Sequence, residues 1–248
     1  MDMRNIKHLR VPRLPKEYQE VEYLRSMADG YIDSGYAFTE PELKIEFKYM
    51  KEENLSTNPF GVDTSSTVAG RLMHGHIFSG NIYCGNGGRA INFDEGKQVI
   101  GKIYDGSFEI IGTEPDEQKC ILRINGGSQT LTNNATYFFG GCTISDFILG
   151  TRANAAGSTS SYLFKGRFYH IRFYDSTGTM VRNFVPCYRK SDGEVGLYDL
   201  CGSICLQTNT PFYINLQSGH FGKGEDVVGG FVKQIRRNGA VVWEESAE

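Results

Sequence analysis

Hydrophobic and polar residues alternate with a period of two along several stretches of this chain, which predicts β-strands. The clearest stretch is 42–49, where Leu43, Ile45, Phe47 and Tyr49 alternate with four charged residues, Glu42, Lys44, Glu46 and Lys48. Because successive side chains of a strand point to opposite faces, we expect a half-buried strand with one face in solvent. No amphipathic helix is evident, and no repeat of about 20 to 50 residues is visible, which argues against a solenoid or propeller.

Residues 166–200 predict two aromatic-rich strands joined by a turn. The first strand should present one set of side chains on a single face, namely Phe168, His170, Arg172 and Tyr174. Asp175–Gly178 has turn chemistry, because Asp and Ser bond nearby backbone and Gly accepts positive φ. We expect 180–185 to form the return strand, Pro186 to end it because proline cannot donate, and 193–198 to start another short strand.

Shorter apolar runs follow one another between Val99 and Leu122. Three clusters of turn-forming residues are expected to separate such runs, at Asp105-Gly106, Asn125-Gly126-Gly127 and Asn133-Asn134. This spacing is typical of antiparallel all-β domains. The 30 glycines among 248 residues exceed the ordinary share of about 7%, as many tight turns require, and the length suits one large sandwich.

Two blocks of sequence resemble concanavalin-A-like (laminin-G-like) jelly-roll domains of phage and prophage proteins. The C-terminal block contains Gly-Arg-Phe-Tyr at 166–169, Val-Arg-Asn-Phe-Val-Pro-Cys at 181–187 and Gly-Glu-Val-Gly-Leu-Tyr-Asp-Leu at 193–200. The N-terminal block contains Leu14-Pro15, then 21–24 and the run Gly-Tyr-Ile-Asp-Ser-Gly-Tyr at 30–36. The resemblance implies an all-β, antiparallel jelly-roll β-sandwich over residues 14–219. The ligands of such domains vary widely, so it implies little about what is bound.

The two ends of the chain differ from this domain. In residues 1–13 a cation stands at every third position from Arg4 on, and the same spacing continues to Lys16. A second series with the same period, Ile6, Leu9, Pro12 and Pro15, is apolar or proline. A period of three suits an extended polyproline-like arm. This arm either docks on a neighbouring subunit or is a solvated tail. Residues 220–248 read as a linker and a β-hairpin whose strands, 232–235 and 240–243, flank an Arg-Arg-Asn-Gly turn. The hairpin either packs on the sandwich or pairs with another chain.

Net charge and the lack of targeting signals limit the classes of binding partner and the location that we expect. The net charge of −3 gives no reason to expect nucleic acid or an anionic membrane as the main partner. No apolar run follows the basic residues near the N-terminus, so we expect neither a secretory signal nor membrane insertion. Together with the resemblance, this favours a virion protein that is assembled in the bacterial host cytoplasm and becomes extracellular after lysis.

Metal and cofactor sites are not expected. The six cysteines lack the paired short spacings of zinc sites, and we interpret them as buried free thiols, although Cys201 and Cys205 could bridge after release. His74 and His76 lie two apart on what could be one strand, but no third ligand accompanies them. No dense run of Asp and Asn suggests calcium, and no glycine-rich loop precedes a helix as in a nucleotide site.

Catalytic groupings are missing as well. Glycoside hydrolysis needs two carboxyl groups across the sugar, and the acidic clusters at 94–95 and 114–117 read as solvated loop charges. No Gly-x-Ser-x-Gly elbow is present. We therefore predict that the chain is not an enzyme; a degraded glycan hydrolase is a distant alternative.

Sugar binding is a second class of function to consider, because lectin-like sandwiches hold sugars with aromatic rings, amides and loop carboxylates. Two loops offer such groups, and the candidate carbohydrate-binding residues are Phe78, Asn81, Tyr83, Arg152 and Asn154. Each of these types is also common in turns and sandwich rims. The favoured hypothesis is a homo-oligomeric virion protein that contacts other virion proteins through its termini and adheres to host-surface or mucosal glycans. The alternative is capsid or tail decoration without sugar binding.

Overall fold

The computed structural model describes residues 14–53, 58–63, 73–74, 76–78, 81–84, 89–91, 99–114, 117–132, 144–153, 160–161, 163–201, 212–213, 222–224, 234–237 and 240–244. Every regular element in these segments is a β-strand. In the same segments no helix has the length and hydrophobicity that a membrane span requires.

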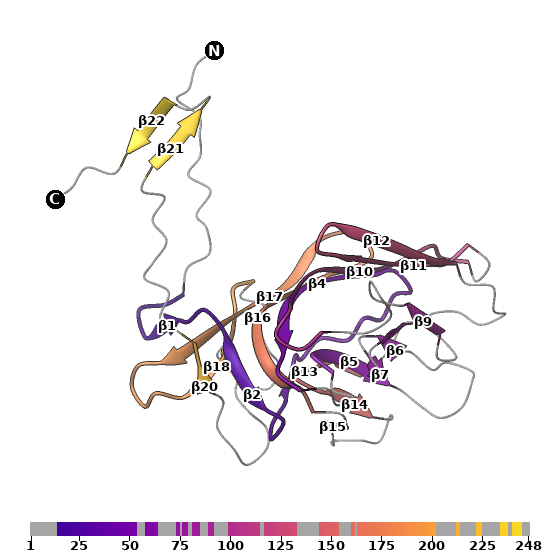
Figure 1. The fold of residues 1–248 in the computed structure, drawn as a ribbon, viewed down its shortest axis with the longest axis horizontal. Coiled ribbons are helices and arrows are strands. Elements are labelled where there is room, and N and C mark those ends of the chain that lie inside the picture. Colours follow the sequence, from indigo (N-terminus) through magenta and orange to yellow (C-terminus); the bar gives the residue numbers. More distant parts are fainter. Residues whose placement is uncertain are drawn as a thin grey trace.

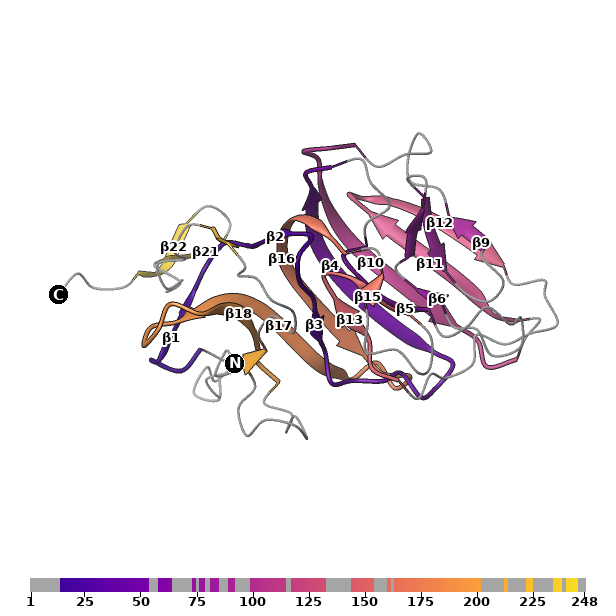
Figure 2. The same ribbon diagram turned by 90° about the horizontal axis from the view of Figure 1, so that it is seen from below.

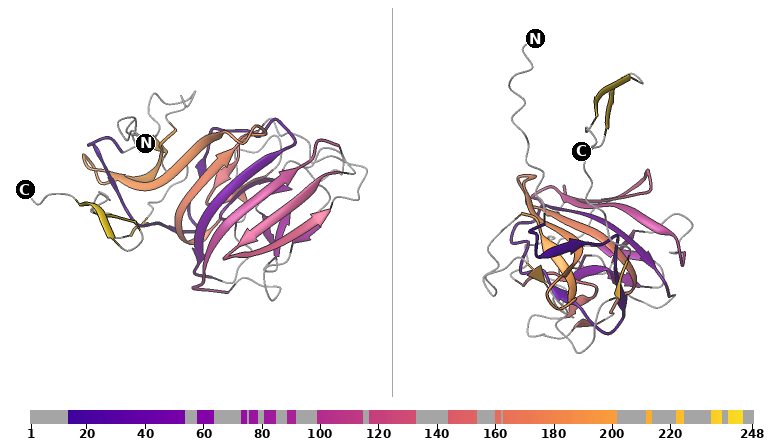
Figure 3. Two further views of the ribbon diagram at one scale, coloured as in Figure 1. Left: turned by 90° about the horizontal axis from the view of Figure 1, so that it is seen from above. Right: turned by 90° about the vertical axis from the view of Figure 1, so that its left-hand side faces the viewer.

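The strands form two stacked sheets, and the larger has eleven strands. Its main path runs β12-β11-β10-β4-β16-β17-β18-β19, with β1 beside β17, and β2 beside both β16 and β20. Its strands are Tyr18–Glu20 (β1), Leu24–Met27 (β2), Leu43–Lys51 (β4), Ile103–Ile111 (β10), Lys119–Ile124 (β11), Gly127–Thr132 (β12), Lys165–Tyr174 (β16), Met180–Arg189 (β17), Val195–Asp199 (β18), Phe212–Tyr213 (β19) and Gly222–Lys223 (β20). Figure 1 shows this sheet curving over the smaller one, and in Figure 3 (left) its central strands lie side by side.

The smaller sheet has six strands in the order β15-β14-β5-β13-β3, with β6 beside β5. They span Ile32–Asp33 (β3), Phe60–Asp63 (β5), Met73–His74 (β6), Phe147–Ile148 (β13), Thr151–Ala153 (β14) and Ser160–Ser161 (β15). Every strand pair in the described segments is antiparallel except β5 with β14. Seen from below, this sheet crosses in front of the larger one (Figure 2). The predicted all-β, antiparallel sandwich of jelly-roll type is confirmed.

The core between the two sheets is rich in aromatic rings. In β4 the side chains of Leu43, Ile45, Phe47 and Tyr49 are buried and the residues between them are partly exposed, as the alternation predicted. Phe47 on β4 and Phe60 on β5 pack against each other between the two sheets, with their ring centroids 5.2 Å apart. Burial of these rings removes large apolar areas from water, which is the main stabilising contribution to such a sandwich.

Two further groups of strands lie outside these sheets. His76–Phe78 (β7), Asn81–Cys84 (β8) and Arg89–Ile91 (β9) form a three-stranded sheet, whose first two strands lie against β5 and β6. Gln234–Arg237 (β21) and Ala240–Glu244 (β22) form the predicted C-terminal hairpin. Its first strand extends two residues further than the sequence indicated, because Arg236 and Arg237 pair with β22, so the connection shortens to residues 238–239. Residues 1–13 lie outside the described residues, and the basic arm stays a prediction.

The hairpin of β16 and β17 confirms the predicted turn. The Asp175 carboxylate accepts hydrogen bonds from the backbone N–H groups of Thr177 and Thr179 at 2.9 and 3.0 Å, and Gly178 has a φ of 76°. The predicted strict alternation in β16 is wrong. A bulge between Phe168 and His170 turns Phe168 into the core with Ile171 and Phe173, whereas His170 stays on the outer face.

Pro186 does not end the return strand, contrary to the prediction, since β17 continues to Arg189. Beside Pro186, strand β17 changes partner from β16, last paired at Phe184, to β1, first paired at Cys187. The Pro186 carbonyl accepts the Val21 N–H at 3.0 Å on that side. A missing N–H is tolerated there because no ladder bond is required of it.

Asp105-Gly106 is not a turn either, but lies inside β10. A Cβ on Gly106 would lie 2.0 Å from the backbone oxygen of Arg123. The glycine therefore serves the close approach of β11 rather than a change of direction. Asn125-Gly126 does form a turn, between β11 and β12, with φ of 48° and 86°.

Candidate functional site

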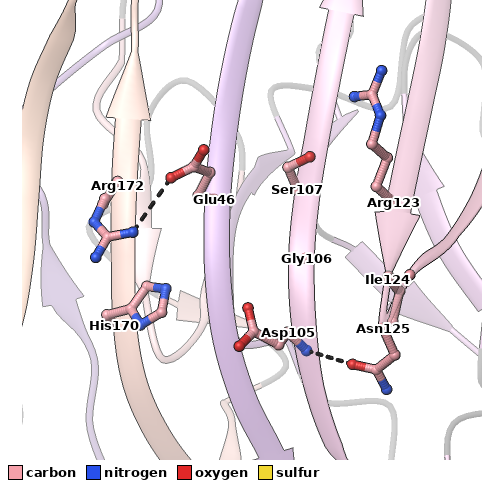
Figure 4. Close-up of a pocket in the computed structure, with 10 residues that line it drawn as sticks. Glu46, Asp105, Gly106, Ser107, Arg123, Ile124, Asn125, His170 and Arg172 are labelled. Atoms are coloured by element: carbon pink, nitrogen blue, oxygen red, sulfur yellow. Dashed lines mark hydrogen bonds and ion pairs between the residues drawn. The ribbon is translucent and has the colours of Figure 1, made fainter. Parts of the chain in front are cut away.

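A polar cleft lies on the outer face of the larger sheet, where β16, β4, β10 and β11 run side by side (Figure 4). Its volume is about 410 Å³. The side chains or backbone of ten residues line it: Glu46, Asp105, Gly106, Ser107, Arg123, Ile124, Asn125, Gly126, His170 and Arg172. This volume lies within the ordinary range of small-ligand sites, about 300–1,000 Å³.

Glu46, on the central strand β4, is the hub of the polar contacts. Its carboxylate pairs with Lys44 at 2.8 Å and with Arg172 at 3.4 Å, and accepts the Tyr174 hydroxyl at 2.8 Å. Partial burial of Glu46 acts to raise its pKa, but the hydrogen bonds from Lys44, Tyr174 and Arg172 outweigh this and the pKa is lowered. Burial and the bond to Glu46 raise the pKa of Tyr174 to about 12. Glu46 is therefore ionised and fixed at neutral pH.

Ion pairs extend this network across the sheet. Arg123 on β11 pairs with Glu109 on β10 at 2.6 Å, and Lys48 on β4 pairs with Asp105 on β10 at 3.5 Å. The Asp105 side chain remains 56% exposed, so its carboxylate is open to a ligand. These pairs are partly solvated and contribute little to stability individually, but they fix the positions of the charged groups.

His170 lies beside Arg172 on β16 (Figure 4). Burial, together with the positive charges of Arg172 and Lys48, lowers the pKa of His170 to about 4, although Asp105 and Glu46 act in the other direction. The ring is neutral at physiological pH. A neutral imidazole offers one donor and one acceptor.

Asn125 shapes the end of the cleft rather than offering its amide to a ligand. Its Oδ1 accepts the Asp105 N–H and its Nδ2 donates to the Ile103 carbonyl, both at 3.0 Å. These bonds hold the turn after β11 against the start of β10.

Glu46 is not suited to act as the general acid of a glycosidase. A glycosidase centre needs a carboxylic acid that stays protonated near neutral pH, opposite a second carboxyl group. The pKa of Glu46 is lowered, and Glu20, whose pKa burial raises, lies on β1 outside the cleft. The arrangement offers fixed hydrogen-bond donors and acceptors.

The structure places the sequence-predicted sugar-binding residues elsewhere. Phe78 and Asn81 pair across β7 and β8, and Tyr83, also on β8, pairs with His76 and Ala90. They were expected in loops but belong to strands. Arg152 lies in a different sheet, on β14 opposite Val62 and Ser160, and Asn154 lies outside the described residues. A sugar site at these five residues stays a prediction.

Other candidate groups also have defined positions. His74 and His76 belong to different strands, β6 and β7, in different sheets, so the expected single strand is wrong. Within the described segments, no group of three or more His, Cys, Asp or Glu is arranged to hold a metal ion. Glu114 and Glu117 are exposed in a turn between β10 and β11, whereas residues 94–95 lie outside the described segments.

Three of the cysteines can be assigned. Cys120 and Cys187 are buried, as predicted, Cys201 is half-buried, and none of the three forms a disulfide. Burial raises the pKa of Cys187 to about 12, with a contribution from Glu20, so its reactive thiolate is suppressed. Cys205, the proposed partner of Cys201, lies outside the described residues.

The sequence alone did not identify the cleft. The alternation in β4 predicted that Lys44, Glu46 and Lys48 share a solvated face, but not which residues lie opposite them. Arg172 is 126 positions from Glu46, and Arg123 lies on yet another strand. The available signal was the presence of polar and charged residues at alternate positions of several predicted strands.

Comparisons with known proteins give only distant similarities. No protein-family model and no curated protein matches the chain. Among solved structures, the chain is similar to a protein from Bacteroides ovatus that is provisionally assigned as carbohydrate binding, with 10% identity and a TM-score of 0.49. The similarity covers 84% of this chain and 62% of that protein, so the chain spans less than two thirds of its length.

Two further structures are more distant. A heptameric SAP-like pentraxin from Limulus polyphemus has 10% identity and a TM-score of 0.41, covering 64% of this chain and 75% of that one. Scytalido-glutamic peptidase has 12% identity and a TM-score of 0.30, covering 71% and 82%. At TM-scores below 0.5 none of these likenesses carries an argument about function. The pairing and stacking of the strands show the β-sandwich directly.

Proposed function

We propose that this chain is a non-enzymatic, glycan-binding β-sandwich of the concanavalin-A-like type, and that the cleft on its larger sheet takes a neutral saccharide. One observation carries the proposal: the four charged residues lining the cleft, Glu46, Asp105, Arg123 and Arg172, have a net charge of zero. With His170 neutral, the cleft presents donors and acceptors without selecting an ionic ligand.

Saccharide hydroxyls both donate and accept hydrogen bonds, so they need this mixture of groups. Carboxylates accept from hydroxyls, guanidinium groups donate to them, and charge-assisted bonds of this kind are stronger than neutral ones. The groups are carried by paired strands rather than by loops, so little conformational entropy is lost when a ligand binds.

A glycan array probed with the full-length chain, with and without chelator, tests the proposal. We expect saturable binding to neutral glycans that is insensitive to chelator. Asp105→Asn should weaken it about 5- to 10-fold, because the amide replaces a charge-assisted hydrogen bond of about 1.5–3 kcal/mol by a neutral one of about 0.5–1.5 kcal/mol. Glu114→Gln makes the matching change of carboxylate to amide in an exposed turn outside the cleft and should leave binding unchanged.

Variants at Asn81 and Tyr83 test the predicted site on β8. If binding is lost in Asn81→Ala and Tyr83→Ala but kept in Asp105→Asn, the saccharide binds there rather than in the cleft. If the wild-type chain binds no glycan on the array, the second candidate function is favoured, namely decoration of a particle without sugar binding.

We further propose that the protein belongs to a phage virion, in which it contacts other virion proteins through residues 1–13 and the β21–β22 hairpin and forms a homo-oligomer. The resemblance of the sequence to phage and prophage domains supports this proposal, as do the basic three-residue period of residues 1–13 and the hairpin. A chain without residues 1–13 and 230–248 should fail to enter particles, and its normal incorporation would overturn the proposed role of the termini.

A further inference from the structure

A second cavity lies away from the cleft, between the segment that leads into β1 and the turn that follows β17. Its volume is about 620 Å³. Eight residues line it: Pro15, Lys16, Glu17, Tyr18, Arg189, Lys190, Ser191 and Tyr198. None of them lines the cleft on β4 and β10.

Two tyrosines give this cavity an aromatic wall. The ring centroids of Tyr18 on β1 and Tyr198 on β18 lie 5.0 Å apart, with the ring planes at 57°. Both side chains are half-buried, and burial raises the pKa of each, so both phenols are neutral. Tilted rings of this kind offer apolar surface to a ligand that has C–H groups on one side.

Hydrogen bonds hold both sides of the cavity in place before any ligand binds. The Lys190 N–H donates to the Glu17 carbonyl and the Lys190 Nζ to the Lys16 carbonyl, each at 2.9 Å. On the other side, Asp192 holds the Arg189 guanidinium at 2.6 to 3.1 Å and accepts the Glu194 N–H at 3.1 Å. A preformed site of this kind loses little entropy when a ligand binds.

The charge at the cavity is positive, although the whole chain carries −3. Lys16, Arg189 and Lys190 line it against Glu17 alone, so the lining residues carry a net charge of +2, whereas those of the cleft carry zero; outside the lining, Asp192 and Glu194 offset the charge of Arg189. An anion is therefore favoured over a neutral molecule or a cation, in contrast to the cleft.

We propose that this cavity is a second binding site, for an acidic saccharide of the uronic-acid type. The pyranose ring lies against Tyr18 and Tyr198, and the carboxylate faces Lys16 and Lys190. The inference shares with the proposed function only the assumption that the ligand is a saccharide, since the two sites have no residue in common.

Titration of the full-length chain by NMR with methyl β-D-glucuronide and methyl β-D-glucoside tests this site, because the two probes differ in the carboxylate alone. We expect the glucuronide to bind at least about fivefold more tightly at low salt, near 50 mM, since solvent-exposed ion pairs contribute modestly. The preference should shrink at about 500 mM salt through screening. Equal affinity of the two probes at this cavity, read from the resonances of the residues that line it, or binding of neither probe there, would overturn the proposal.

Variants locate the bound saccharide. Tyr198→Leu keeps an apolar side chain but removes the ring and should abolish glucuronide binding at this cavity. Lys190→Gln should reduce glucuronide affinity to that of the glucoside, whereas Lys102→Gln, which removes a charge beside Tyr104 outside the cavity, should change nothing. Unchanged glucuronide binding in Tyr198→Leu and Lys190→Gln would rule out this cavity.

Two variants separate the test of this cavity from the test of glycan binding in the cleft. Asp105→Asn should leave glucuronide binding intact, and Tyr198→Leu should leave neutral-glycan binding intact. If Asp105→Asn instead abolishes glucuronide binding, the acidic sugar occupies the cleft; the second site is then overturned while glycan binding by the sandwich stands.

Discussion

Arg182 and Asp199 form an ion pair in the interior, where β17 lies beside β18. The Arg182 Nε lies 3.6 Å from Asp199 Oδ2, and the two side chains are only 8% and 0% exposed. Asp199 Oδ1 accepts the N–H groups of Asn183 and Cys201 at 2.8 and 3.0 Å. Arg182 also donates to backbone carbonyls, among them that of Gly35 at 3.3 Å. A pair this deeply buried is costly to break, because the remaining charge stays desolvated.

Replacing Arg182 alone should therefore destabilise the fold strongly. We expect Arg182→Met to lower the free energy of unfolding by about 3–5 kcal/mol in urea denaturation. Arg182→Met combined with Asp199→Asn should recover part of this loss, because the neutral amide can still accept the two N–H groups. Arg189→Met breaks a partly exposed ion pair with Asp192 and serves as the control, with an expected cost of at most about 1 kcal/mol. A similar cost for both single variants would contradict the argument.

His170 links stability to pH. Its pKa is about 4 in the folded chain, below the ordinary value of about 6.5 in an unfolded one. Between these values the unfolded chain binds a proton that the folded chain does not, so stability is full above pH about 6.5 and falls as the pH drops toward about 4. Because the ring is only half-buried and solvent screens it, we expect a contribution of about 1–2 kcal/mol.

The comparison between wild type and His170→Gln isolates this contribution. The difference in unfolding free energy between the two proteins should change by that amount from pH about 7 to about 4, measured by urea denaturation at several pH values. Other acidic groups titrate in the same range but affect both proteins alike. Parallel pH profiles would mean that the His170 pKa is not lowered in the fold.

Among the strands, β10 and β11 leave no room for a side chain at Gly106. The Arg123 carbonyl occupies the space that a Cβ would need, at 2.0 Å, and the preceding residue, Asp105, carries one of the charges of the cleft. Backbone atoms cannot rotate away as a side chain can, so any larger residue must push the two strands apart.

Gly106→Ala should thus cost about 2–4 kcal/mol of stability and weaken glycan binding at the cleft, because overpacking forces backbone shifts. Gly126→Ala provides the control. Gly126 has a φ of 86°, but open space surrounds the position that its Cβ would take, with no heavy atom beyond its chain neighbours within 4 Å, so only the backbone strain of about 1–2 kcal/mol applies. Thermal unfolding and the glycan array measure the two effects. Equal costs for both substitutions would show that β11 can move away without loss.

Across the whole molecule, the larger sheet extends beyond the predicted end of the jelly-roll domain. The division into residues 1–13, 14–219 and 220–248 stays a prediction, but β20 at Gly222–Lys223 pairs with Leu24 and Arg25 of β2. In addition, Gly224 donates its N–H to the Tyr23 carbonyl at 2.8 Å, and the Lys223 Nζ lies 4.0 Å from the Tyr188 ring centroid.

Two shortened chains test how far the folding unit extends. Residues 14–224 should fold cooperatively with nearly the stability of the full chain. Residues 14–219 lack β20, and we expect them to be less stable by about 1–2 kcal/mol, since about 0.5–1.5 kcal/mol is lost with each hydrogen bond and some packing is lost as well. Chemical denaturation of both fragments measures the difference. Identical stability would place the end of the domain at residue 219.

Local features could be predicted from the sequence because they depend on neighbouring residues. The alternation of Leu43 to Tyr49 determines a half-buried strand wherever its partners lie. The Asp175–Gly178 and Asn125-Gly126 turns follow from side-chain bonds to nearby backbone and from tolerance of positive φ. The all-β sandwich follows from many such strands and turns in one chain.

Features that depend on which strands become neighbours could be seen only in the tertiary structure. The bulge in β16 moves Phe168 into the core. Pro186 is accommodated where β17 changes partner. Position 106 must be glycine because a backbone carbonyl of β11 lies where a Cβ would be. The cleft likewise needs Glu46, Arg123 and Arg172 from three strands far apart in the sequence. Strand order and register are long-range choices set by the packing of the whole sandwich, and the alternation within a single strand does not contain them.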